Sequence, residues 1–264
     1  MDSFVFWALA ATLGTWLITA LGAATVLFFS APKEKYMDLM LGFAAGVMMA
    51  ASFWSLLQPA IERAEASGKP AWFIATTGFL TGAMFLWGSD KIVTSSRRKA
   101  AFPEQSGKRG ERALMLVLSV TLHNIPEGLA VGVAFGALHN GCTPEEWMGA
   151  VSVAVGIGLQ NFPEGAAVAL PLRRDGMSRK RSFFFGQASG MVEPIAGVLG
   201  ALAVTHMEAI LPFMLSFAAG AMILVAVHEL IPECQQNRSA SPYFATTGIL
   251  LGFAAMMLLD VMLG

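Results

Sequence analysis

The sequence is poor in charge and in cysteine. Only 13% of its 264 residues are Asp, Glu, Lys or Arg, whereas soluble domains average about 25%. The deficit extends along the whole chain, which argues against a soluble domain and indicates a polytopic membrane protein. The two cysteines, Cys142 and Cys234, supply neither a disulfide framework nor a CxxC metal pair.

Two further features are missing. The net charge is −1, so no basic surplus favours nucleic acid as a partner. The chain starts Met1-Asp2-Ser3 without the basic segment of a signal peptide. We therefore expect its first apolar run to be a spanning helix and not a cleaved signal.

What the chain does have is a succession of apolar runs of about 20 residues, long enough to cross a bilayer. They predict an all-α integral membrane protein with eight transmembrane helices in a single domain, residues 1–264, without a soluble module. The expected spans are roughly 4–29, 37–60, 71–93, 113–138, 147–170, 183–204, 211–233 and 243–263.

The basic residues lie almost entirely on one side of this arrangement. Of the 17 Lys and Arg residues, all but Arg63 and Lys69 fall in or beside the loops after spans 1, 3, 5 and 7. Basic loops are retained in the cytoplasm. The sequence thus predicts a plasma-membrane protein, or an inner-membrane protein in a bacterium, with both termini outside.

Segments of the two halves resemble each other. Residues 41–49, LGFAAGVMM, match residues 215–223, LSFAAGAMI, and residues 73–82, FIATTGFLTG, match residues 243–252, YFATTGILLG. Span 2 thus resembles span 7 and span 3 resembles span 8, and these partners run in opposite directions. We expect an inverted repeat of spans 1–3 and 6–8 around a central pair, spans 4 and 5, as in many transporters.

A polar motif occurs twice within this apolar background. Residues 122–129 read LHNIPEGL and residues 159–166 read LQNFPEGA. Helical spacing puts Glu127 on one face with His123 and Asn124, and Glu164 on one face with Gln160 and Asn161. Facing each other, the motifs offer one imidazole, two carboxylates and three amides. This set predicts a divalent-cation site, or two sites that share the carboxylates.

Pro126 and Pro163 free the carbonyls of Leu122 and Leu159, which favours irregular backbone beside a polar cavity. The alternative is that the polar residues only join helices and the prolines only kink them. Two buried glutamates in matching frames argue against it, because charge at membrane depth is costly.

Other polar residues within the spans suggest a path for an ion. Glu193, followed by Pro194, is a further candidate ligand in span 6, and Met48 offers a thioether in span 2. The path would run from the outside past Gln58 and Glu62, through the motifs, and to the inside past the remaining candidates. These are His228, Glu229 and Asp90.

These motifs resemble the ZIP family of divalent-metal transporters, and the compact length resembles its prokaryote-type GufA branch. The resemblance rests on HNIPEG, the second PEG motif, the Glu-Pro of span 6 and HELIPE in span 7. It implies a homodimer, an elevator-like motion of spans 1, 4, 5 and 6 against the rest, and a binuclear metal centre.

The resemblance also implies a ligand set. The first metal would bind His123, Glu127, Gln160 and Glu164, with Met48 as an extra ligand. The second would bind Asn124, Asn161 and Glu193 and share Glu127 and Glu164. His228, Glu229 and Asp90 would form the cytoplasmic exit. Gln160 replaces a histidine common in the family, so selectivity is expected to be broad, and the loop after span 3 lacks the family's histidine-rich tract.

The resulting hypothesis is import of Zn²⁺, with Cd²⁺, Fe²⁺ and Mn²⁺ as other possible substrates, by a carrier and not an enzyme. Protonation of a ligand could promote release. A metal-selective channel and an exporter remain alternatives. An intramembrane metallohydrolase is another, since HELIPE starts like HExxH, but Pro232 occupies the position of the second histidine.

Overall fold

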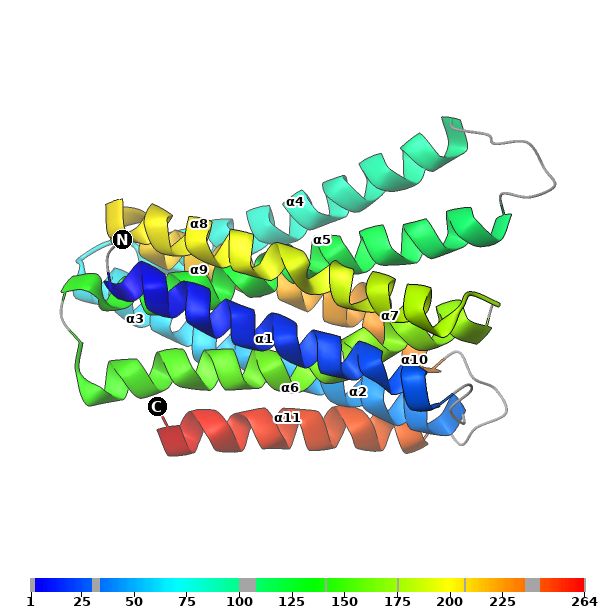
Figure 1. Cartoon of the computed structure of the whole chain (residues 1–264). Helices are drawn as coiled ribbons and strands as arrows, with labels where there is room; N and C mark the ends of the chain where they lie inside the picture. The colour runs from blue at the N-terminus through cyan, green and yellow to red at the C-terminus, as the bar shows by residue number, and fades with distance from the viewer. Residues whose placement is uncertain are drawn as a thin grey trace.

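The computed structural model describes residues 3–29, 34–99, 108–140, 142–174, 176–206, 208–235 and 243–263. Within these residues the fold is an all-helical bundle without strands (Figure 1). The long helices are α1 (Ser3–Phe28), α2 (Glu34–Ala51), α4 (Ala71–Lys99), α5 (Lys108–Gly136), α6 (Pro144–Arg174), α8 (Val192–His206), α9 (Leu211–Val225) and α11 (Tyr243–Leu263).

Three of the expected spans contain irregular turns. A π-helix, η1 (Ser52–Leu57), joins α2 to α3 (Gln58–Ala66), and a second, η5 (Ala226–Leu230), joins α9 to α10 (Ile231–Gln235). A 3₁₀ turn, Ser189–Met191, joins α7 (Arg179–Ala188) to α8. Short 3₁₀ turns also occur at Ala137–Asn140 and Glu208–Ile210. π-Helical turns within α-helices often mark functional sites.

The two motif helices do not break at their prolines. α5 is continuous through Pro126, and α6 is continuous through Pro163 and Pro171. Thr143 fixes the start of α6 with a capping box: its backbone N–H donates to Glu146 Oε2 at 3.1 Å, and the Glu146 N–H donates to Thr143 Oγ1 at 3.2 Å. The expectation of irregular backbone at the motifs is therefore wrong for these helices.

Small residues let the helices approach closely in pairs. The most extensive pairings are α2 with α11, α1 with α6, α4 with α9 and α5 with α8. In each pair a glycine rests on the backbone of the partner, for example Gly46 on Ile249, Gly165 on Thr19, Gly82 on Phe217 and Gly132 on Gly197. Such glycine contacts are typical of helices that pack within membranes.

Within the part of the chain that the structure describes, six segments are long and apolar enough to cross a membrane: Ser3–Phe28, Lys35–Ala66, Ala71–Ser89, Arg179–Val204, Leu211–Gln235 and Tyr243–Met262. Large apolar side chains cover their outer faces, including Trp72 at 75% exposure and Val261 at 73%. Outward-facing apolar side chains suit a lipid environment, and they identify a multi-pass membrane protein.

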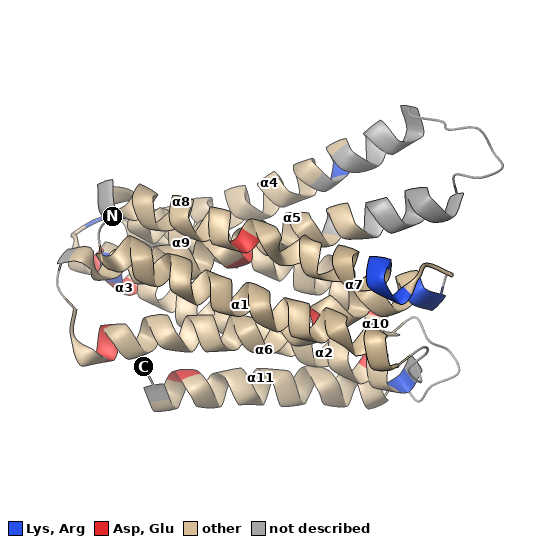
Figure 2. Ribbon diagram, in the orientation of Figure 1, with Lys and Arg blue, Asp and Glu red and all other residues tan. Residues whose placement is uncertain are grey.

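The two ends of the bundle differ in charge. α1 begins and α11 ends at one end, which we call the terminal end (Figure 1). The opposite end, which we call the basic end, carries Lys35 at the start of α2 and Arg179–Arg181 at the start of α7, and most of the described Lys and Arg residues gather there (Figure 2). Acidic segments lie inside the bundle as well as at its ends (Figure 2).

Candidate metal centre

The doubled motif lies in the interior of the bundle, on the facing sides of α5 and α6. Glu127, Gln160 and Asn161 are completely buried, Asn124 is 1% exposed and Glu164 is 5% exposed. Gly128 and Gly165 allow neighbouring helices to cover the motifs closely. Gly128 rests on the backbone of α8 at Glu193, and Gly165 rests on the backbone of α1 at Thr19. The predicted convergence of the two motifs is therefore present in the fold.

A direct hydrogen bond joins the two motifs. The Gln160 amide donates from Nε2 to Glu127 Oε1 at 2.9 Å. The second carboxylate oxygen of Glu127 and the amide oxygen of Gln160 have no hydrogen-bond partner. The pair thus presents two free oxygen ligands in a fully buried position.

The neighbouring cluster is built around Glu193 of α8. Thr15 of α1 donates to Glu193 Oε2 at 2.5 Å, and Asn161 of α6 donates to the same oxygen from Nδ2 at 2.9 Å. Thr19 donates to Glu193 Oε1 at 3.4 Å. Glu193 itself is completely buried, and these neutral donors are what satisfy its carboxylate. The structure therefore joins α1, α6 and α8 at one acidic group.

His123 takes a position that the sequence did not predict. Its Nε2 lies 2.7 Å from Glu229 Oε1 in η5, so it contacts an expected exit residue. A small cavity of about 50 Å³, which we call the inner cavity, lies near the basic end. Its lining includes His123, Glu164, Glu229 and Glu233. The contact connects the first motif to the π-helix of the seventh predicted span.

Unpaired oxygens are concentrated in the motifs. Among the described residues, buried side-chain oxygens without a hydrogen bond occur at Asn124, Glu127, Gln160, Asn161, Glu164 and Ser182. All but Ser182 belong to the doubled motif. Because an unsatisfied buried polar atom is costly, such a concentration indicates a binding site for a polar or charged ligand. Carboxylate and amide oxygens suit divalent cations.

No three His, Cys, Asp or Glu side chains in the described part of the chain lie close enough together to hold a metal ion by themselves. Two observations explain this. Several expected ligands are amides, and His123 is turned towards Glu229. A metal in this conformation would depend on the amide oxygens of Gln160, Asn161 and Asn124 beside the carboxylates.

A larger cavity of about 710 Å³, which we call the terminal-end cavity, opens near the terminal end. Gln58 and Glu62 both line it and share a hydrogen bond of 3.0 Å. Asp260 of α11 lines it too and accepts hydrogen bonds from Ser55 at 2.8 Å and Ser152 at 3.0 Å. The structure thus brings the two expected outer residues together and adds Asp260, a residue without a role in the sequence analysis.

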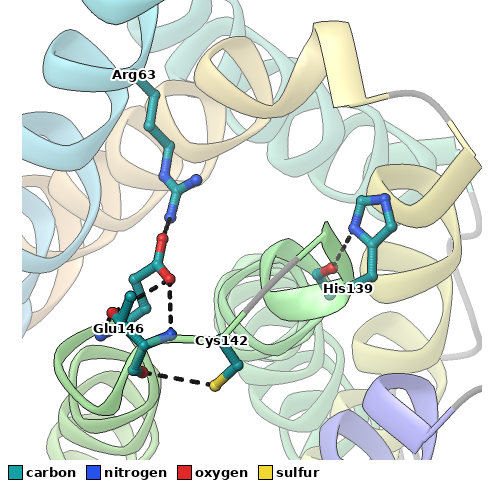
Figure 3. Close-up of polar contacts among 6 residues, drawn as sticks. Arg63, His139, Cys142 and Glu146 are labelled. Atoms are coloured by element: carbon teal, nitrogen blue, oxygen red, sulfur yellow. Dashed lines mark hydrogen bonds and ion pairs between the residues drawn. The ribbon is translucent and has the colours of Figure 1, made fainter.

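An ion pair crosses the wall of this cavity. Arg63 of α3 lies 3.6 Å from Glu146 at the start of α6 (Figure 3). Cys142 lies beside this pair, and His139 Nδ1 contacts the Gly136 carbonyl at 3.0 Å (Figure 3). Both cysteines are free: Cys142 is exposed at this end, and Cys234 is buried in α10.

The remaining expected residues are dispersed. Met48, in α2, is completely buried in the apolar core of the bundle. His228 is exposed although Glu229 beside it lines the inner cavity. The side chain of Asp90, in α4, lies outside the described part of the chain. Thr15 and Thr19 were missed by the sequence analysis because threonines in an apolar helix usually bond their own backbone; their alignment four residues apart was the available signal.

Comparisons with known proteins identify the class. Residues 102–260 match the family model described as ZIP zinc transporter. Human zinc transporter ZIP11 is 39% identical, over 99% of this chain and 98% of its own. Zinc transporter GufA of Myxococcus xanthus is also 39% identical, over 97% of this chain and 98% of its own. Zinc transporter ZIPB of Bordetella bronchiseptica is 35% identical, over 93% and 78%.

The chain belongs to the ZIP zinc transporter family. Full-length similarity to both GufA and ZIP11 confirms the resemblance seen in its motifs. Each of these relatives is named a transporter. Their names are consistent with the prediction that this chain is a transporter and not an enzyme.

Proposed function

We propose that the protein imports Zn²⁺ into the cytoplasm through the doubled motif of α5 and α6. The observation that carries the proposal is the concentration of unpaired buried oxygens at Asn124, Glu127, Gln160, Asn161 and Glu164. Groups of this kind that converge at membrane depth have a high cost unless they bind an ion. The names of the relatives supply zinc as the first candidate.

The contacts support a proposal of two adjacent metal positions. The first would use Glu127, Gln160 and Glu164, with His123 joining after it leaves Glu229. The second would use Asn124, Asn161 and Glu193 and share the two motif glutamates. A set dominated by oxygen, with one imidazole, tolerates several divalent ions, so Cd²⁺, Fe²⁺ and Mn²⁺ are further candidate substrates.

The cavities suggest how the ion moves. The terminal-end cavity reaches α6 as far as Val153, which is about two helical turns, roughly 10 Å, from Gln160. The inner cavity instead includes Glu164 and His123. The motif in this conformation is therefore closed towards Gln58 and Glu62 and borders on the basic end. If the basic end is cytoplasmic, both termini lie outside the cell. This conformation is then closer to the inward-facing state than to the outward-facing state.

We propose that eight spans form an inverted repeat and that this repeat underlies an alternating-access mechanism. The proposal adds α5 and α6 to the six candidate spans. These helices have 29 and 31 residues, and each exceeds the about 20 residues that a bilayer requires. The π-helices η1 and η5 begin at Ser52 and Ala226, 174 positions apart, which is the offset of the FAAG segments. Gly46 meets Ile249 as Gly220 meets Phe79, at matching positions of the two halves.

The packing also suggests which helices move. The pairs α1–α6 and α5–α8 form one group around the motifs, and the pairs α2–α11 and α4–α9 form the other. We infer that the first group moves against the second as an elevator, in a protein that assembles as a homodimer. Gln58 and Glu62 then receive the ion, and Glu229, with His228 and Asp90, releases it.

The test is metal flux into proteoliposomes that contain the purified full-length protein. Wild type is compared with Glu127→Ala and Glu164→Ala, using Zn²⁺, Cd²⁺, Mn²⁺ and Fe²⁺. Ser182→Ala is the matched control, since Ser182 is equally buried and unpartnered but lies outside the motifs. We expect both glutamate variants to lose at least about 100-fold in flux, because loss of a group that only supports a metal ligand already costs about 10–100-fold, while Ser182→Ala transports normally.

Unchanged flux in the glutamate variants would show that the motifs are structural and would refute the proposal. The dependence on concentration separates a carrier from a channel. We expect flux to saturate at low Zn²⁺ and to rise steeply with temperature, because a conformational step limits a carrier. Flux that increases linearly with Zn²⁺ would indicate a channel with the same ligands.

A further inference from the structure

An apolar groove lies on the surface of the bundle, on the outer side of the second motif. It has a volume of about 570 Å³ and lies between α1, α2, α6 and α11. Its walls include Ile18, Leu39, Phe43, Val155, Phe162 and Leu251. Val155 is 41% exposed, Phe162 is 39% exposed and Leu251 is 56% exposed, so the groove is open to its surroundings.

The surroundings of this groove are the bilayer interior. α1 and α11 are candidate spans, and Lys35–Ala66 contains the groove residues of α2. An apolar cavity does not hold water. At this depth the material available to fill it is a hydrocarbon chain.

A positive charge lies at one end of the groove. Lys35 precedes Leu39 by one turn of α2, about 5.4 Å, and Phe244 precedes Gly248, another groove residue, by one turn of α11. The Lys35 Nζ lies 5.4 Å from the Phe244 ring centroid and 5.0 Å from the Tyr36 ring centroid. The ammonium group is therefore held between α2 and α11, in line with the groove and at the basic end.

This combination has the charge distribution of a phospholipid site. A hydrocarbon channel leads from mid-membrane to a cation at the end of a span, where anionic phosphate groups concentrate. We propose that the groove binds one acyl chain of an anionic phospholipid and that Lys35 contacts its phosphate. Phe162 and Pro163 place this chain against the helix that carries Asn161 and Glu164.

The experiment uses the full-length protein, without metal, in nanodiscs that contain a photoreactive phosphatidylglycerol with the reactive group on its acyl chain. A matched phosphatidylcholine probe is run in parallel. After illumination, labelled peptides are mapped by mass spectrometry. We expect phosphatidylglycerol label to concentrate at residues 39–43, 155–163 and 248–251, and to exceed phosphatidylcholine label there by roughly fivefold.

Two variants separate the head group from the chain. Lys35→Gln should reduce phosphatidylglycerol labelling to the phosphatidylcholine level, and Lys35→Arg should restore it. Val155→Trp should fill the groove and reduce labelling by both lipids. The controls are Lys91→Gln, because Lys91 lies 3.8 Å over the Trp87 ring on α4, and Leu80→Trp, an exposed position outside the groove. Both should label as wild type.

Equal labelling by the two lipids, or uniform labelling around the bundle, would refute the proposal. A groove without label would also refute it and would indicate that a second copy of the chain covers this face. Because the assay needs no metal, it can fail while transport through the motifs persists, and it can succeed if transport is lost.

Discussion

Thr15 illustrates how neutral side chains support the acidic centre. It is 2% exposed, and its hydroxyl donates to Glu193 at 2.5 Å. A buried acceptor that loses its hydrogen-bond donor is left unsatisfied, which is costly. Thr15, Thr19 and Asn161 together take the place of water around Glu193.

Replacing Thr15 with valine keeps the shape and removes the hydroxyl. We expect Thr15→Val to reduce the free energy of unfolding by about 1.5–3 kcal/mol, because the Glu193 carboxylate loses its shortest partner. Thermal unfolding in detergent measures the effect. Thr15→Ser, which keeps the hydroxyl, should unfold close to wild type. If Thr15→Val also unfolds like wild type, the hydrogen bond to Glu193 does not contribute to stability.

Glycine determines how closely the helices pack at the scale of the elements. A side chain on Gly82 of α4 would collide with the backbone of Phe217 in α9, and one on Gly220 of α9 would collide with Phe79 in α4. Backbone atoms at a helix crossing cannot turn aside as a flexible side chain can. The α4–α9 distance therefore depends on these two glycines.

Gly82→Ala should separate α4 from α9. We expect a loss of about 1–3 kcal/mol in the free energy of unfolding, as for overpacked cores, visible as a lower melting temperature. Gly88→Ala in the same helix is the control, because a Cβ there meets nothing within 4 Å. Alanine favours helix, so Gly88→Ala should stabilise the protein by about 0.5–1 kcal/mol. If both variants melt alike, the crossing does not depend on Gly82.

Charge and exposure provide a test of the proposed orientation of the whole molecule. Cys142 is exposed at the terminal end and Cys234 is buried in α10. If the basic end is cytoplasmic, Cys142 faces the outside. The chain thus carries a natural reporter of its own topology.

We expect a membrane-impermeant maleimide to label Cys142 in intact cells whose outer membrane face is accessible to the reagent. In inverted vesicles the same reagent should label Cys142 only after the vesicles are permeabilised. Cys142→Ser should abolish the signal, since Cys234 is 2% exposed. Labelling of inverted vesicles alone would reverse the proposed orientation and with it the direction of transport.

The sequence by itself determined the class of the protein. Its apolar runs predicted the long helices closely, for example 243–263 against α11 at Tyr243–Leu263. The pairing of the two motifs was also predictable, because the spacing of Glu127, Gln160 and Glu164 within α5 and α6 fixes one polar face on each helix. Local periodicity carries this kind of information.

The tertiary structure alone decided which side chains meet. Hydrogen bonds from Thr15 to Glu193, from His123 to Glu229 and from Ser55 to Asp260 join residues more than 100 positions apart. The two π-helices and the continuity of α6 through Pro163 likewise depend on how neighbouring helices pack. A sequence determines which face of a helix is polar, but the partner of that face is set only when the helices are packed together.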